Sequence, residues 1–177
     1  TITHRDVGNA FFRRFGGPAC DTILQDYRDE KISAAEAFRR ETAAIGRLDV
    51  QDADQFLRKE GMDASFRDFV QYAREHDMDL SIVSDGLDYY IKILLDHNGV
   101  RDVPFFANTL DLRPTERAGF YDVSVAFPFS SAECDRCACC KRNIILTHSG
   151  EDDIIVFVGE GYSDRCAAHY ADIVFAK

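Results

Sequence analysis

A short polar segment after an apolar run offers the first set of groups suited to chemistry. Ser84-Asp85-Gly86 follows the apolar residues 80–83 and supplies a hydroxyl, a carboxylate and a flexible backbone. A small hydroxyl next to a glycine can present O–H and backbone N–H groups to a phosphate. The same triplet also suits an ordinary turn. Its value as a phosphate site therefore depends on what the fold brings near it.

A second segment carries two carboxylates four positions apart, Glu160 and Asp164, directly after the apolar run 154–158. Carboxylate oxygens are ligands that Mg²⁺ favours, because it is a hard cation that also bridges to substrate phosphate. Helix capping by Ser163 or Asp164 explains the pattern equally well. We predict a magnesium site at Glu160 and Asp164 because these carboxylates occur together with the Ser84 segment and Lys141 in the same chain.

Lys141 begins a predicted helix over 141–147, where its ammonium group could neutralise a phosphate. Four of the six cysteines crowd just before it: Cys134, Cys137, Cys139 and Cys140. Cys-x-x-Cys spacing is compatible with a zinc-binding module, although a structural zinc site usually takes a second pair from elsewhere. The alternative is a tight turn leading into Lys141. Clustered cysteines in a chain of this length indicate a reduced, cytoplasmic setting, since disulfide scaffolds are usually shorter.

Short apolar runs alternate with helical patterns from residue 79 onward. The runs lie at 80–83, 154–158 and 173–175. This alternation predicts an α/β fold, a Rossmann-like parallel sheet with helices on both faces. Ligands of such sheets bind at the carboxyl ends of the strands, where the polar segments lie. The period of two over 121–127 predicts a strand with one buried face, which could form a hairpin with 105–110.

The first part of the chain has helical spacing instead. Val7, Phe11, Phe12 and Phe15 form one apolar stripe. Residues 33–36, Ser-Ala-Ala-Glu, predict a capping box at the start of a further helix. We expect a wholly helical cap over 6–74, inserted after the first strand, and an α/β core formed by 1–5 and 75–177.

Charge and hydropathy exclude several classes of partner. The chain has a net charge of −10 over 177 residues, which disfavours nucleic acid and anionic membranes as partners. No segment approaches the ~20 apolar residues of a membrane helix. No basic stretch followed by an apolar run suggests a secretion signal. A small phosphorylated metabolite remains a suitable partner, and the protein could be a monomer or a homodimer.

The order of Ser84, Lys141, Glu160 and Asp164 resembles the later motifs of the haloacid dehalogenase (HAD) phosphatases. The start, Thr1-Ile-Thr, resembles the end of their first motif, Asp-x-Asp-Gly-Thr. The segment Cys-Ala-Cys-Cys-Lys at 137–141 points to one group within this superfamily. It is similar to the group containing the 2-hydroxy-3-keto-5-methylthiopentenyl-1-phosphate and phosphoserine phosphatases.

The resemblance implies Mg²⁺-dependent hydrolysis of a small phosphomonoester through an aspartyl-phosphate intermediate. The nucleophile and the general acid–base aspartate would precede Thr1, so the first strand of the core would be truncated. The C-terminus of the core would be truncated as well. Lys141 and Ser84 would be catalytic, and Glu160 and Asp164 would bind Mg²⁺. The residues that would bind phosphate are Thr1, Ser84, Asp85, Gly86 and Lys141.

Two further alternatives remain at this point. A catalytically inactive, phosphate-binding HAD-like protein would share the sheet and the cap but lack turnover. A hydrolase using Thr1 as an N-terminal nucleophile is disfavoured, because such enzymes usually open with a strand and a phenylalanine-striped helix follows here.

Overall fold

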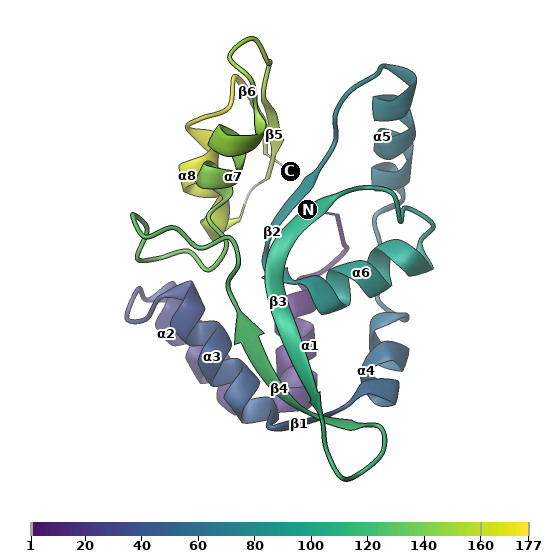
Figure 1. Ribbon diagram of the computed structural model, residues 1–177, viewed down its shortest axis with the longest axis vertical. Coiled ribbons are helices and arrows are strands. Elements are labelled where there is room, and N and C mark those ends of the chain that lie inside the picture. The colour runs from purple at the N-terminus through teal and green to yellow at the C-terminus, as the bar shows by residue number, and fades with distance from the viewer. Residues whose placement is uncertain (1, 160, 177) are drawn as a thin grey trace.

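A curled four-stranded sheet runs through the middle of the molecule in Figure 1, with helices packed around it and a two-stranded sheet at one end. This computed structural model describes residues 2–159 and 161–176. The elements are α1 (Val7–Gly16), α2 (Ala19–Arg28), α3 (Ala34–Ile45), β1 (Arg47–Asp49), α4 (Val50–Leu57), α5 (Ala64–Glu75), β2 (Ile82–Leu87), α6 (Asp88–His97), β3 (Phe105–Pro114), β4 (Phe120–Ala126), α7 (Lys141–His148), β5 (Val156–Val158), η1 (Tyr162–Asp164), α8 (Arg165–Ala168) and β6 (Ile173–Phe175).

The larger sheet has the order β1-β4-β3-β2 and the smaller one pairs β5 with β6. The pairs β2–β3 and β5–β6 are parallel, whereas β3–β4 and β1–β4 are antiparallel. The predicted hairpin is confirmed, since β3 and β4 pair from Thr109–Ala126 to Pro114–Tyr121. Val123 and Val125 of β4 pack against the core, as the period of two requires.

The helical stripes of the sequence become the core of the first region. Phe11 and Phe12 of α1 are almost wholly buried, and Phe12 packs edge-on against Phe38 of α3. The Asp6 carboxylate caps α1 by accepting a hydrogen bond from the Asn9 N–H at 2.9 Å. These contacts join α1 and α3 into one packed unit.

The expectation of an entirely helical region over 6–74 is wrong at β1, whose residues 47–49 pair with β4. Gly46 ends α3 with a φ of 63°, a left-handed conformation that glycine adopts without strain. The extended backbone that follows brings Leu48 into the core with no exposed surface. A three-residue strand is too short to show a period of two in the sequence, so hydrophobic periodicity could not predict β1.

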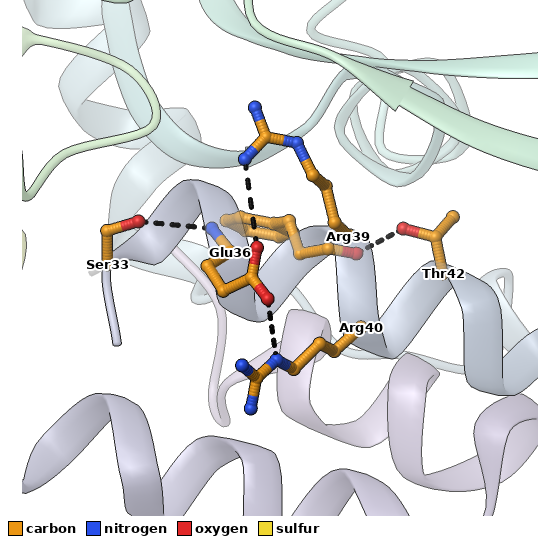
Figure 2. Close-up of polar contacts among 6 residues, drawn as sticks. Ser33, Glu36, Arg39, Arg40 and Thr42 are labelled. Carbon is orange, nitrogen blue, oxygen red and sulfur yellow. Dashed lines mark hydrogen bonds and ion pairs between the residues drawn. The ribbon is translucent and has the colours of Figure 1, made fainter. Parts of the chain in front are cut away.

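The capping box predicted at the start of α3 forms only in part. Ser33 Oγ accepts the hydrogen bond of the Glu36 N–H at 3.2 Å. The Glu36 carboxylate, however, turns outward to Arg40 Nε at 2.7 Å and to Arg39 at 3.9 Å, as Figure 2 shows. Two arginines on the same helix face outcompete the backbone for this carboxylate.

The chain enters and leaves the helices α1–α4 through two adjacent connections. Thr3 forms an antiparallel bridge with Met62, and the Asp63 N–H donates to the Ile2 carbonyl at 3.0 Å. Arg5 forms an ion pair with the buried Glu60 across the same two segments. This pairing brings together the two points where the helices α1–α4 leave and rejoin the chain, and β1 attaches the same helices a second time through β4.

The short strands β5 and β6 are more exposed than the sequence suggested. Ile154 is 75% exposed and Phe175 of β6 is 57% exposed, so the expected cover on both faces is missing there. Within the described residues, the outer edges of β2 and β5 have no strand partner. No helix among residues 2–159 and 161–176 has both the length and the apolar character needed to cross a membrane.

Candidate active site

A buried ion pair joins two predicted site residues that are 23 positions apart. Lys141 Nζ lies 2.5 Å from Asp164 Oδ1, and the two residues are only 9% and 8% exposed. The other carboxylate oxygen of Asp164 accepts the Gly161 N–H at 2.7 Å. Burial makes such a pair costly unless hydrogen bonds compensate, and both Asp164 oxygens have a partner here. Lys141 starts α7, directly after the cysteine-rich loop.

Ser84, Asp85 and Gly86 lie within β2, where its pairing with β3 is irregular between Val83 and Leu87, and not in a turn after the strand as the sequence suggested; we call this segment the Ser84 turn. Ser84 Oγ accepts a hydrogen bond from the Gly86 N–H at 3.0 Å. A side chain at Gly86 would overlap the Tyr90 ring, and a Cβ at Gly8 would lie 2.9 Å from the Tyr90 hydroxyl. Glycine is therefore required at position 86 by close packing with Tyr90.

Asp85 connects this turn to the loop before Lys141. Its carboxylate accepts the Cys139 N–H at 2.7 Å. Burial raises the pKa of Asp85 to about 6, although the Cys139 hydrogen bond and the positive charge of Lys141 oppose that rise. The Asp85 side chain thus positions the loop that carries Lys141, a role that its sequence position did not reveal.

Two residues that sequence reasoning missed support the same turn. Asn108 of β3 is fully buried and donates through Nδ2 to the Asp85 carbonyl at 2.7 Å, while its Oδ1 has no partner among the described residues. Burial also raises the pKa of the Tyr90 hydroxyl, which stays protonated. An asparagine inside the otherwise apolar start of β3 was the available signal for Asn108.

A third missed residue is Glu41 of α3, which is only 6% exposed. Burial, with a smaller contribution from the nearby Asp6 carboxylate, raises its pKa to about 8. No hydrogen bond or ion pair engages its carboxyl group within the described part of the chain. Acidic residues on amphipathic helices are usually solvated, so its helical position gave no warning.

The cysteine-rich loop contains free thiols. Cys139 and Cys140 are buried, whereas Cys134 and Cys137 are half-buried. Over residues 2–159 and 161–176 no group of three or more His, Cys, Asp or Glu side chains is arranged to hold a metal ion. The zinc alternative therefore finds no support in this loop, and the predicted turn leading into Lys141 is what the structure has.

The structure thus gathers most of the predicted site into two connected groups. Ser84, Asp85 and Gly86 form one, Lys141 and Asp164 form the other, and the Asp85–Cys139 hydrogen bond links them. The remaining predicted site residues, Thr1 and Glu160, lie outside the described residues. A hydroxyl, backbone N–H groups and a buried ammonium group are the chemistry of a phosphate-binding site.

Comparison with known sequences agrees with the phosphate-binding chemistry of this site. The model of a family described as Putative Phosphatase matches residues 41–176. A 2-hydroxy-3-keto-5-methylthiopentenyl-1-phosphate phosphatase from Lysinibacillus sphaericus is 32% identical over all of this chain and 78% of its own length. The chain belongs to the HAD phosphatases. A second phosphatase of the same name, from Brevibacillus brevis, is 27% identical over all of this chain and 78% of its own length.

Solved structures confirm the fold of this HAD phosphatase. A phospho-aspartyl intermediate analogue of phosphoserine phosphatase has a TM-score of 0.76 at 14% identity, covering 99% of this chain and 81% of that one. A substrate-bound phosphoserine phosphatase has a TM-score of 0.74 at 15% identity, with 99% and 80% coverage. The predicted α/β HAD fold and the assignment as a HAD-type phosphomonoesterase are both confirmed.

Proposed function

We propose that this phosphatase hydrolyses a small-molecule phosphomonoester with the help of Mg²⁺, through an aspartyl-phosphate intermediate. The observation that carries the proposal is the buried Lys141–Asp164 pair, held beside the Ser84 turn by Asp85. A fixed ammonium group in a site withdrawn from water offsets the repulsion between an attacking carboxylate and a phosphate anion.

The proposed phosphate contacts come from the turn and from the start of α7. The Ser84 hydroxyl and the Gly86 N–H, which bond each other here, would turn to the phosphoryl oxygens. Lys141 Nζ would neutralise charge on the phosphate and on the nucleophile. Asp85 would act through the loop by keeping Lys141 in position, in addition to the phosphate contact expected from the sequence. Thr1 would complete the phosphate contacts.

Glu160 and Asp164 are the proposed Mg²⁺ ligands. The donor chemistry fits, since both are carboxylates and the Asp164 oxygens each keep a lone pair beyond their bonds to Lys141 and Gly161. The metal would draw charge from the phosphoryl oxygens. Asp164 would additionally hold the Lys141 ammonium group in its buried position.

The proposed nucleophile is an aspartate on a strand that would precede Thr1. The open outer edges of β2 and β5 support a strand lying between them, because both carry site residues at their carboxyl ends. Hydrolysis of the aspartyl-phosphate by water would then release inorganic phosphate.

Residues 6–74 are proposed to form a cap that closes over the pocket and selects the substrate. The Thr3–Met62 bridge brings together the points where helices α1–α4 leave and rejoin the chain, which supports a unit formed by these four helices within that range. The expected partner is a small phosphorylated metabolite, rather than nucleic acid or a membrane, and the expected location is the cytoplasm. We expect a monomer or a homodimer.

The test is a phosphomonoester panel measured on the protein with its preceding residues, with and without Mg²⁺ and EDTA. The panel includes 2-hydroxy-3-keto-5-methylthiopentenyl-1-phosphate, phosphoserine and phosphoethanolamine. We expect turnover of at least one compound that EDTA abolishes and Lys141→Ala removes, while Lys92→Ala on the exposed face of α6 retains it. Phosphate binding without any turnover would instead identify the inactive alternative.

A further inference from the structure

The pairing of β2 with β3 changes register at the Ser84 turn. Val83 of β2 pairs with Phe106 of β3, and the next pair along the strands is Leu87 with Asn108. Here β2 advances by four residues while β3 advances by two, so the Ser84 turn contains two residues more than the facing strand can pair. Such a bulge bends the strand, re-aims its side chains and takes backbone groups out of the ladder.

The Asn108 side chain bonds to the backbone of this bulge. Its Nδ2 donates to the Asp85 carbonyl at 2.7 Å, while Asp85 itself has no pair in the register of the described strands. Just beyond the bulge, the Leu110 N–H donates to the Asp88 carboxylate at 2.9 Å. Side chains therefore connect the two segments where the backbone pairing is interrupted.

Packing alone does not account for an asparagine at position 108. The residue is fully buried, and its Oδ1 has no hydrogen-bond partner among residues 2–159 and 161–176. A buried acceptor without a partner costs about 1–3 kcal/mol. An apolar side chain of similar size would avoid that cost. What the amide adds is its donor to the Asp85 carbonyl.

The residue held by this amide is connected to the rest of the site. The Asp85 carboxylate accepts the Cys139 N–H at 2.7 Å, and Cys139 is wholly buried just before Lys141. On the other side of Asp85, the Gly86 N–H donates to Ser84 Oγ at 3.0 Å. One contact with the Asp85 backbone therefore bears on the proposed phosphate-binding groups and on the loop before Lys141.

We propose that Asn108 is a positioning residue for phosphoryl transfer, whose side-chain amide holds the bulge in the shape that presents Ser84 and Gly86 to the phosphate. It touches no reacting atom and acts through Asp85. A displacement of about 1 Å in such groups can lower a rate by about a hundredfold, because the reacting atoms lose their alignment. The inference rests on the proposed function, in which the Ser84 turn binds the phosphoryl group.

Asn108→Leu tests this role, since leucine keeps much of the side-chain volume and removes the donor to Asp85. In the protein with its preceding residues and Mg²⁺, kcat for p-nitrophenyl phosphate should fall by about a hundredfold. Inhibition by orthovanadate should weaken more than inhibition by inorganic phosphate, because a transition-state analogue depends more on the alignment of the turn.

Thr109→Val is the matched control on the same strand. The Thr109 side chain is half-buried, and its hydroxyl makes no hydrogen bond within the described part of the chain. This variant should keep the kcat of the parent and its sensitivity to orthovanadate. A kcat for Asn108→Leu close to that of Thr109→Val would overturn the proposal.

A double-mutant cycle with Ser84→Ala separates positioning from a general loss of structure. If Asn108 acts through the Ser84 turn, the double variant should have a kcat only slightly below that of the slower single variant, since both changes disable one unit. Independent effects would instead multiply. Losses in kcat that multiply would show that Asn108 does not act through the turn, and would overturn the proposal.

Urea unfolding establishes that each variant is measured in its folded state. Asn108→Ser is the second variant if Asn108→Leu does not fold, because the serine hydroxyl is too short to reach the Asp85 carbonyl and serine fits the space. A parent protein without turnover would contradict the proposed function instead. Calorimetric binding of inorganic phosphate then tests the turn, and equal affinities of the parent and Asn108→Leu would overturn the positioning role.

Discussion

The two ends of the molecule are held together in different ways. Around α1 and α3, stability comes from close aromatic packing, with Phe11 contacting Phe12, Phe15, Tyr89 and Tyr90. Around β5 and β6, apolar side chains face solvent and the described contacts are largely polar, such as Lys141–Asp164 and the Ile155 N–H to Asp172 at 2.8 Å. Substitutions in the first region should act through folding alone, whereas those at the Lys141–Asp164 pair should impair the chemistry as well as the fold.

The strongest test of this contrast is Lys141→Ala, which should lower kcat by about a thousandfold, since a single preorganised charge at a transition state contributes on that order. It should also destabilise the fold by about 3 kcal/mol, because Asp164 would remain buried without its partner. Phosphatase kinetics and urea unfolding measure both effects. A change in kcat of less than about tenfold would remove Lys141 from the proposed catalytic residues.

Phe11→Ala should destabilise the fold without impairing the chemistry. Loss of a fully buried phenylalanine costs about 3–5 kcal/mol through the cavity it leaves. Below its lowered Tm, the variant should keep kcat within a few-fold of the parent. The matched control is Ile154→Ala, which is highly exposed and should change the unfolding free energy by less than about 0.5 kcal/mol. Equal losses in the two variants would contradict the contrast.

Glu41 gives a pH-dependent test within the packed region. Its pKa rises from 4.5 to about 8 on folding, so the native state holds a proton that the unfolded chain releases. The native state should lose stability as the pH rises between these two values. Glu41→Gln should remove this loss, and the gain over the parent near pH 8.5 should be up to about 5 kcal/mol.

Unfolding free energies from pH 5 to pH 9 measure the effect of Glu41. The exposed Glu116→Gln should track the parent at every pH. Parallel curves for the parent and Glu41→Gln would show that this carboxyl group titrates as it does in water.

The smallest expected effect is that of Ser33→Ala, which removes the cap of α3. A lost N-cap hydrogen bond costs about 1 kcal/mol. Glu36→Gln keeps the backbone donor to Ser33 and loses only exposed ion pairs with Arg39 and Arg40, so it should cost less. Thermal unfolding of the two variants compares them, and a larger loss for Glu36→Gln would reverse the assignment.

Features that depend on a single helix, strand or short motif could be predicted from the sequence. The stripe of Phe11 and Phe12, the period of two in β4 and the order of the motifs around Ser84 and Lys141 are local features. The pairing of β1 with β4, the Asp85–Cys139 hydrogen bond and the burial of Glu41 depend on segments far apart in the chain. Neither hydrophobic periodicity nor motif spacing carries that information.

The narrow attachment at Thr3 and Met62 restricts how the helices α1–α4 can move. Two backbone segments that are paired cannot slide independently, so a change of a few dihedral angles there turns all four helices as one rigid lever. Any rotation about this pivot must also break the pairing of β1 with β4 and the packing of Phe11 against Tyr89 and Tyr90, so these contacts limit how far the helices can turn. The Arg5–Glu60 ion pair joins the two segments at the pivot, so it would oppose rotation there.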